Sequence, residues 1–280
     1  MKDILFHFDS YPDPTPIEAI DQAVRFARVF GAEITALAVQ VDFKPPGNWL
    51  AERLVNLSGI CAQEEQKSLA NCKAAFAAFL EKAAAANLKG STLLAKSEQA
   101  LLGDEVSVRA RSRDLCLVPM VDSFDGQRSV VEAVLFQSGR PVLIFRPGVA
   151  DLPAREPQTV VLAWDGSRQA ARAMSDALPI LKMAMQVRVL TVIKEKPEAT
   201  SGLGADVVRH LVVHGVNAVA DEVDIGQRKV GPAISEYVKT HGADLLVMGG
   251  YGRSKLREFI LGGATQHLLH EPRVAIMLSH

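Results

Sequence analysis

The stretch that decides the fold is Met248–Thr265, which reads MGGYGRSKLREFILGGAT. Glycines gather at its two ends, and a basic, amphipathic segment lies between them. The stretch continues from the short apolar run Leu245–Met248, which predicts a buried strand. Bare backbone at both ends of one loop, at the end of a strand, indicates a site that main-chain amides approach closely.

The glycines of this loop suit a phosphate chain. Several backbone N–H groups can converge on phosphate oxygens only where no Cβ blocks the approach. We expect Gly249 and Gly252 to form the opening turn of the loop, and Gly262 and Gly263 to lead into the last helix. The free N–H groups and the positive dipole end of that helix favour an anion.

Two side chains of the loop have roles that the residues leave open. Thr265 either donates its hydroxyl to the anion or caps the last helix. Arg253 either reaches a phosphate with its guanidinium or faces solvent, as we expect for Lys255 and Arg257.

The chain contains a large internal repeat. Asp3–Ser10 (DILFHFDS) and Thr159–Ser167 (TVVLAWDGS) are both apolar runs that end in an aspartate, and these aspartates, Asp9 and Asp165, lie 156 residues apart. Each run precedes a helical pattern and a second strand-like run. We therefore expect two homologous domains, residues 1–148 and 157–280.

Within the second copy, strand and helix patterns alternate five times. The predicted strands are the apolar run that begins at Thr159 and residues 187–193, 218–223, 245–248 and 274–278, and the predicted helices are residues 170–183, 206–214, 230–241 and 265–270. Such alternation predicts an α/β fold with a parallel sheet that helices cover on both faces. The first copy follows the same order, with Ile17–Phe30 as a helix and Glu33–Val41 as a strand.

The first copy also departs from the second. Residues 42–60 are expected to form an extended loop or insertion, and a long helix should follow. Its predicted apolar face comprises Leu69, Cys72, Phe76, Phe79, Leu80 and Ala83.

Asp165 should lie at the same edge of the sheet as the glycine loop, because both follow the carboxyl ends of parallel strands. Its carboxylate suits the ribose hydroxyls or the adenine amine of a nucleotide. The alternative is a cap on the following helix, for which Ser167 competes.

The spacing G-x2-G-x9-G, followed here by Gly263, Ala264 and Thr265, resembles the nucleotide-binding signature G-x2-G-x9-G-(S/T) of the universal stress protein family. The resemblance covers nearly the whole chain. It implies two tandem five-stranded Rossmann-like domains and a pocket for ATP or AMP, with or without Mg²⁺. It also implies a role in tolerating stress, a protein partner, and pairing of the domains through Pro141–Phe145 and Arg273–Leu278, with a further homodimer as an additional assembly.

The resemblance assigns roles to residues of the second copy. Asp165 would hold adenine or ribose, and Val192 would meet adenine through its backbone. The ribose and phosphates would be surrounded by Met248, Gly249, Gly252, Gly262, Gly263, Ala264 and Thr265. Gly263 stands where the family usually has Ser or Thr, which removes a hydroxyl and should weaken binding.

The first copy has no glycine loop. After Val118 it reads PMVDSFDGQ, and Asp122 and Asp125 would repel a phosphate. We expect Val131–Leu135 to take the place of the glycine-led helix start. The first domain is therefore expected to be a degenerate, structural or partner-facing copy.

Net charge, cysteine content and histidine spacing indicate which partners, compartment and metal sites to expect. The 280 residues carry a formal net charge of −1, which disfavours nucleic acid and anionic membranes as partners. Three cysteines without a CxxC pair, and no signal or membrane segment, favour the cytoplasm. His210 and His214 have the i, i+4 spacing of metal ligands, but no third ligand is evident.

No motif of a known catalytic class is present, so at most slow ATP hydrolysis is expected. The alternative to nucleotide binding is a protein-interaction scaffold with an empty pocket, which Gly263 favours.

Overall fold

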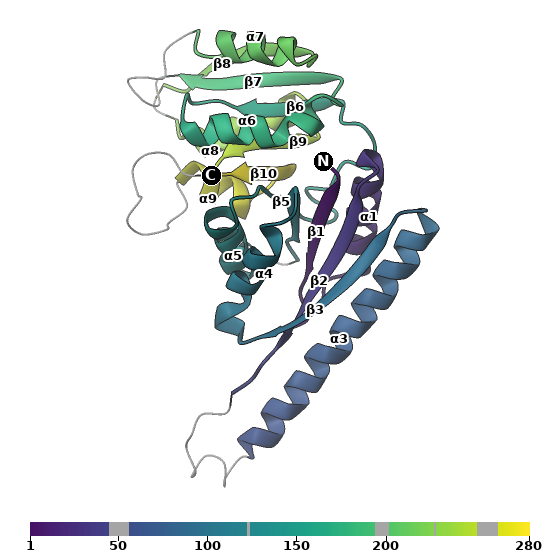
Figure 1. Ribbon diagram of the computed structural model, residues 1–280. Coiled ribbons are helices and arrows are strands. Elements are labelled where there is room, and N and C mark those ends of the chain that lie inside the picture. The colour runs from purple at the N-terminus through teal and green to yellow at the C-terminus, as the bar shows by residue number, and fades with distance from the viewer. Residues whose placement is uncertain (45–55, 122–123, 194–201, 227, 251–262) are drawn as a thin grey trace.

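The computed structural model describes residues 1–280 except residues 45–55, 122–123, 194–201, 227 and 251–262. Both halves of the chain alternate strands and helices (Figure 1). The elements of the first half are β1 (Asp3–Phe8), α1 (Ile17–Phe30), β2 (Glu33–Val41), α3 (Leu57–Ala85), β3 (Gly90–Ser97), η1 (Gln99–Leu101), α4 (Leu102–Ala110), β4 (Leu115–Pro119), α5 (Phe124–Ala133), η2 (Val134–Ser138) and β5 (Val142–Phe145).

The second half repeats this order. Its elements are β6 (Thr159–Ala163), α6 (Arg168–Leu181), β7 (Gln186–Ile193), α7 (Ala205–Val213), β8 (Ala218–Asp224), α8 (Val230–Thr240), β9 (Leu245–Gly249), α9 (Gly263–His270) and β10 (Ala275–Ser279). The predicted α/β class and the five-strand repeat are thus confirmed.

One sheet of ten strands runs through the molecule in the order β3-β2-β1-β4-β5-β10-β9-β6-β7-β8. Strand pairs within each half are parallel, and β5 meets β10 antiparallel, with Ile144 opposite Ile276. This is the pairing predicted between Pro141–Phe145 and Arg273–Leu278. Because β5 and β10 run in opposite directions, the carboxyl ends of the strands lie at opposite rims of the sheet in the two halves.

Alternate side chains of the strands enter two separate cores. Phe6 and Leu162 belong to a core with α1, α3, α6 and α7, and Leu5 and Val161 belong to a core with α4, α5, α8 and α9. Strands buried on both faces read as nearly continuous apolar runs, which is why β1, β4 and β9 were recognisable in the sequence.

Two local predictions need correction. Residues 57–60, expected in a loop, form the first turn of α3, where the Asn56 side chain accepts a hydrogen bond from the Gly59 amide. Leu80, expected on the apolar face of this helix, is 45% exposed. The buried side of α3 runs instead through Ser68, Cys72, Ala75, Phe79 and Ala83.

A further correction concerns the last helix of the first half. α5 begins at Phe124, so Val131 lies inside the helix rather than at its start. The helix continues directly into η2, and Gly139 ends it with a φ of 69°.

Of the described residues, none belongs to a helix long and apolar enough to cross a membrane.

Candidate functional site

Asp165, Gly166 and Ser167 form the turn between β6 and α6. The Asp165 Oδ1 atom accepts the Ser167 N–H at 3.0 Å, and the Ser167 Oγ atom accepts the Ala170 N–H at 3.1 Å. Ser167 is therefore the N-cap of α6, and the capping alternative considered for Asp165 is wrong. Gly166 has a φ of 74°, which favours glycine at this position.

Asp165 and the end of β9 lie at the same rim of the sheet, as predicted. β6 and β9 are adjacent and parallel, with Ala163 opposite Met248. β7 lies on the other side of β6 and brings Val192 to the same rim.

Met248 and Gly249 are strand residues, which corrects the expectation that Gly249 opens the loop turn. Met248 pairs with Ala163 on one side and Leu278 on the other, and its side chain is buried. Gly249 pairs with Ser279. A Cβ atom on Gly249 would lie 2.6 Å from the Ala170 amide nitrogen. Close packing against α6 therefore also requires glycine at this position.

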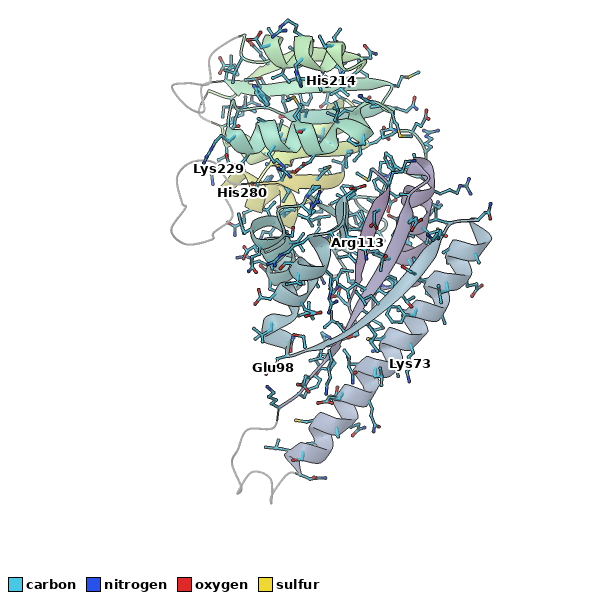
Figure 2. The ribbon with its side chains drawn as sticks, viewed as in Figure 1. Lys73, Glu98, Arg113, His214, Lys229 and His280 are labelled. Carbon is cyan, nitrogen blue, oxygen red and sulfur yellow. The ribbon has the colours of Figure 1, made fainter. Side chains whose placement is uncertain are left out.

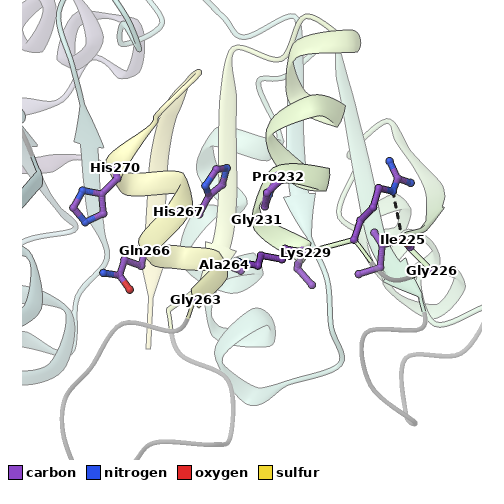
Figure 3. Close-up of a pocket in the computed structure, with 12 residues that line it drawn as sticks. Ile225, Gly226, Lys229, Gly231, Pro232, Gly263, Ala264, Gln266, His267 and His270 are labelled. Carbon is purple, nitrogen blue, oxygen red and sulfur yellow. Dashed lines mark hydrogen bonds between the residues drawn. The ribbon is translucent and has the colours of Figure 1, made fainter.

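A cavity of about 810 Å³ lies between the first turns of α8 and α9 (Figure 3). Gly263 and Ala264 line it, whereas Asp165, Val192, Met248, Gly249 and Thr265 do not. The other lining residues are Ile225, Gly226, Arg228, Lys229, Val230, Gly231, Pro232, Gln266, His267 and His270. Among the described residues of the predicted site, only those at the start of α9 therefore open into this cavity.

The two helix starts approach closely because of Gly231. A Cβ atom there would lie 2.8 Å from the Cβ atom of His267, so a larger residue would force α8 and α9 apart. Figure 3 shows Gly231 of α8 and His267 of α9 beside one another. Two positive helix ends thus face one cavity.

Two cations add to this field. Lys229 directly precedes α8 and is exposed, and nothing within the described part of the chain forms an ion pair or hydrogen bond with its side chain. Figure 2 shows Lys229 at the rim of the second half. Arg228 is held by the carbonyl oxygens of Asp224 and Ile225, at 3.1 and 3.4 Å.

The sequence reasoning missed these two cations. Arg228 and Lys229 follow a predicted strand and directly precede a predicted helix, so this basic pair lies at a helix start. A basic pair at a helix start is the sequence signal that could have identified these two cations. The cavity as a whole suits an anionic ligand.

Thr265 is 3% exposed and lies within the first turn of α9. Gly263 is exposed, and a Cβ atom on it would meet no described atom within 4 Å. Gly252, Arg253 and Gly262 lie outside the described residues.

The first half has a different arrangement at the equivalent place. The Asp9 carboxylate accepts a hydrogen bond from Gln127 Nε2 at 2.6 Å and lies 3.3 Å from His7 Nε2. Asp125, expected to repel phosphate, pairs with Arg128 in α5. Asp122 lies outside the described residues.

The two halves make close contacts around the site. A Cβ atom on Gly250, next after β9, would lie 2.7 Å from Leu135 Cδ2 of the first half. Arg172 donates to the Gly139 carbonyl at 3.1 Å, and the Phe136 and His280 rings meet edge to face at 5.0 Å. Burial, with help from Arg168, lowers the pKa of His280, so this ring is neutral at pH 7.

Metal ligands do not cluster in the described part of the chain, where no group of three or more His, Cys, Asp or Glu side chains could hold an ion. His210 and His214 are ring neighbours on α7, with centroids 4.7 Å apart.

Comparisons with known proteins agree with the fold. The model of the universal stress protein family matches residues 157–280. A universal stress protein from Archaeoglobus fulgidus, 15% identical, covers 98% of this chain and 95% of its own with a TM-score of 0.70. A functionally unknown protein from Pseudomonas aeruginosa, also 15% identical, covers 100% of this chain and 92% of its own with a TM-score of 0.55. No curated protein matches the chain.

Proposed function

We propose that this chain, whose residues 157–280 belong to the universal stress protein family, binds adenine nucleotide in that half and acts as a sensor or regulator in a stress response. The observation that carries the proposal is the convergence of two helix starts and Lys229 on one cavity beside Gly263 and Ala264.

The phosphates would lie at the start of α9. Gly263 and Ala264 offer main-chain amides there, and the open space at Gly263 leaves the backbone accessible. Lys229 supplies a positive charge without a competing carboxylate among the described residues. Gly252, Arg253, Gly262 and Thr265 stay part of the proposed phosphate site on the strength of the sequence signature.

The nucleoside would lie over the carboxyl ends of β6 and β7. Asp165 would accept hydrogen bonds from ribose or adenine, and Val192 would meet the base through its backbone. The half-buried Leu203 supports this placement, because its Cδ2 atom would lie 3.4 Å from a Cβ atom on Gly166 and so offers an apolar surface beside Asp165. Met248 and Gly249 would form the floor between the two ends of the nucleotide.

ATP and AMP both remain candidate ligands. A triphosphate would bring Mg²⁺ on its own oxygens, since no cluster of metal ligands exists within the described residues. Slow ATP hydrolysis remains a proposal beside binding, with Asp165 as the residue to test.

The first half, with the proposed boundaries 1–148, would be the degenerate copy, and residues 157–280 the binding copy. We place the protein in the cytoplasm, a location that three free cysteines, Cys61, Cys72 and Cys116, support. Its protein partner and any homodimer would use surfaces other than β5 and β10, which pair with each other.

A protein-interaction scaffold is the second candidate function. The packing of Gly249 against α6 favours it, because that contact explains one signature glycine without any ligand.

Calorimetric titration of ATP, ADP and AMP into the purified protein separates the two functions. We expect saturable binding that Asp165→Ala and Gly252→Asp both weaken by about tenfold or more, equivalent to about 1.4 kcal/mol. Asp206→Ala is the matched control, because this α7 carboxylate is 94% exposed and is not part of the proposed site. If the wild type does not bind nucleotide, or if Asp165→Ala and Asp206→Ala lose equal affinity, the protein-interaction scaffold is the supported function.

A further inference from the structure

The α5–η2 segment of the first half (Phe124–Gly139) ends in a π-helical turn that is closed by its own last residue. The Ser138 hydroxyl donates to the Val134 carbonyl at 2.5 Å and accepts the Arg140 N–H at 3.0 Å. Gly139 then turns the chain away with a φ of 69°. Single π-helical turns are rare and frequently lie at functional sites. These bonds give the segment a well-defined end.

The Leu135 side chain of η2 lies over Gly250 of the second half. A Cβ atom on Gly250 would lie 2.7, 3.4 and 3.5 Å from the Cδ2, Cδ1 and Cγ atoms of Leu135. The leucine therefore fills the space that a side chain at Gly250 would occupy. Gly250 is also tied to β10, because its N–H donates to the Ser279 carbonyl at 2.8 Å. The backbone at Gly250 is thus held by both β10 and the first half.

Two further contacts join this segment to the second half. The Phe136 ring meets the His280 ring edge to face at 5.0 Å, directly after β10. The Gly139 carbonyl, at the end of the segment, accepts a hydrogen bond from Arg172 of α6 at 3.1 Å. Because α6 begins next to the Asp165 turn, the α5–η2 segment is connected to the end of the proposed site that would hold the nucleoside.

The same segment is connected to the end of the site that would hold the phosphates. Gly250 lies between Gly249 and residues 251–262, which contain two of the signature glycines. At the start of α5, the Phe124 ring lies 5.7 Å from the His270 ring of α9, the helix whose start would hold the phosphates, and Figure 1 shows α5 beside α9. One continuous segment of the first half thus contacts both ends of the proposed site.

The contact at Gly250 bears on affinity through the freedom of the backbone. Glycine loses more conformational freedom on ordering than any other residue, and Gly249 and Gly250 are consecutive glycines at the start of the loop. Leu135 restricts the backbone at Gly250 before a ligand arrives. A site that is ordered in advance binds more tightly, because less entropy is lost when the ligand enters.

We propose that Leu135 is a positioning residue of the nucleotide site, through which the first half sets the affinity of the second half for nucleotide. The first half thus has a role in binding although it lacks the glycine loop. The inference rests on the proposed nucleotide binding in residues 157–280. Because coupling between two sites is reciprocal, nucleotide in the second half in turn restrains η2 in the first half.

Calorimetric titration of ATP and AMP into full-length variants measures the effect on affinity. Leu135→Ala should weaken binding by about threefold to tenfold, because Gly250 regains its freedom. Leu37→Ala is the matched control, since Leu37 is also buried in the same core. It lies in β2, which β1, β4 and β5 separate from the second half. The control should lose similar stability, recorded by urea unfolding, and keep the affinity of the wild type.

Hydrogen exchange supplies a readout that a purely structural role of Leu135 would not change. Saturating ATP should slow amide exchange in residues 134–140 of the first half by about twofold or more. Exchange in β3, the edge strand of the first half, should be the same with and without ATP. In Leu135→Ala, the protection of residues 134–140 should be lost even at ATP concentrations that saturate the variant.

The outcomes separate this inference from the proposed function. If the wild type binds nucleotide but Leu135→Ala and Leu37→Ala have equal affinities, or if ATP leaves exchange in residues 134–140 unchanged, the positioning role is wrong and nucleotide binding stands. If the wild type binds no nucleotide, both fail. If Leu135→Ala does not fold, Phe136→Leu takes its place. This variant loses the ring contact with His280, keeps an apolar side chain, and should weaken binding by about twofold to fivefold.

Discussion

Gly249 of β9 lies directly against the backbone of Ala170 in the first turn of α6, and a Cβ atom on Gly249 would come within 2.6 Å of the Ala170 amide nitrogen. The last residue of β9 and the start of a helix on one face of the sheet are thereby fixed to each other. Gly263, by contrast, has open space where its side chain would be. Packing in the fold thus requires a glycine at Gly249 but not at Gly263.

This difference predicts opposite responses to alanine. Gly249→Ala should destabilise the protein by about 1–3 kcal/mol, because backbone atoms cannot yield to the added methyl group. Gly263→Ala, in the first turn of α9, should leave the free energy of unfolding nearly unchanged. Urea unfolding of both variants measures the contrast, and equal losses would contradict it.

Gly263→Ser should tighten nucleotide binding. The substitution restores the hydroxyl that the family signature carries at this position, and the structure has room for it. One hydrogen bond to a charged group contributes about 1.5–3 kcal/mol, so the dissociation constant of AMP or ATP should fall by about tenfold to a hundredfold. Gly263→Ala, which adds bulk without a donor, is the matched control in the same titration. If the Gly263→Ser and Gly263→Ala variants bind the nucleotide with equal affinity, the hydroxyl does not contribute to binding.

Leu135 and Gly250 should be coupled across the contact between the halves. Gly250→Ala places a methyl group 2.7 Å from Leu135 Cδ2, and the flexible leucine must move aside. We expect a modest loss of stability that Leu135→Ala suppresses in the double variant. A double-mutant cycle of unfolding free energies should give a coupling of about 0.5–3 kcal/mol, and additive losses would show that the contact carries no energy.

Asp221 of β8 should stabilise the fold only while it is ionised. It accepts hydrogen bonds from Arg188 Nη1 at 2.7 Å and from the Tyr237 hydroxyl. Burial raises the pKa of Asp221, but the bonds from Tyr237 and Arg188 outweigh it and hold the pKa below its usual value. Burial and Asp221 raise the pKa of Tyr237 to about 12, so the hydroxyl remains a donor at neutral pH.

Asp221→Asn should therefore cost about 1–3 kcal/mol at pH 7. Because the folded pKa lies below the unfolded value of about 3.9, the contribution is complete above that pH and disappears as the pH falls through the folded pKa. The stabilities of wild type and variant should converge in acid. A gap that persists at the lowest pH would assign the loss to packing instead.

Ionisation of Glu132 should have the opposite effect and should destabilise the fold. Burial raises the pKa of this half-buried α5 carboxyl against the attraction of Arg128. The favourable state is the protonated one, so stability is greatest below the unfolded pKa of about 4.3 and is lost as the pH rises through the folded pKa. Glu132→Gln should thus be more stable than wild type at pH 7 and equal to it near pH 4. Thermal unfolding at both pH values tests this, with the exposed Glu81→Gln as control.

The architecture was readable in the sequence because local and global signals agree. The buried strands read as apolar runs, and α1 and β2 have the residue ranges that the pattern predicts. The extent of the long helix was less accessible, since exposed Leu80 and buried Ser68 break the simple apolar stripe. Burial of Ser68 follows from its hydrogen bonds with Ser10 and the Val41 amide, which are contacts distant in sequence.

The candidate site was only partly predictable for the same reason. The aspartate turn and the start of α9 are local features, and the sequence located both. The role of Gly249 in packing and the contact of Gly231 with His267 depend on which helices lie side by side, which no short pattern specifies.

The antiparallel junction of β5 and β10 makes the molecule a pair of unequal partners within one polypeptide. A symmetric homodimer must carry two identical pockets. In a chain that contains both halves, the sequence of each half can change independently of the other. The proposed nucleotide site would therefore occur once per molecule, whatever the concentration of the protein in the cell.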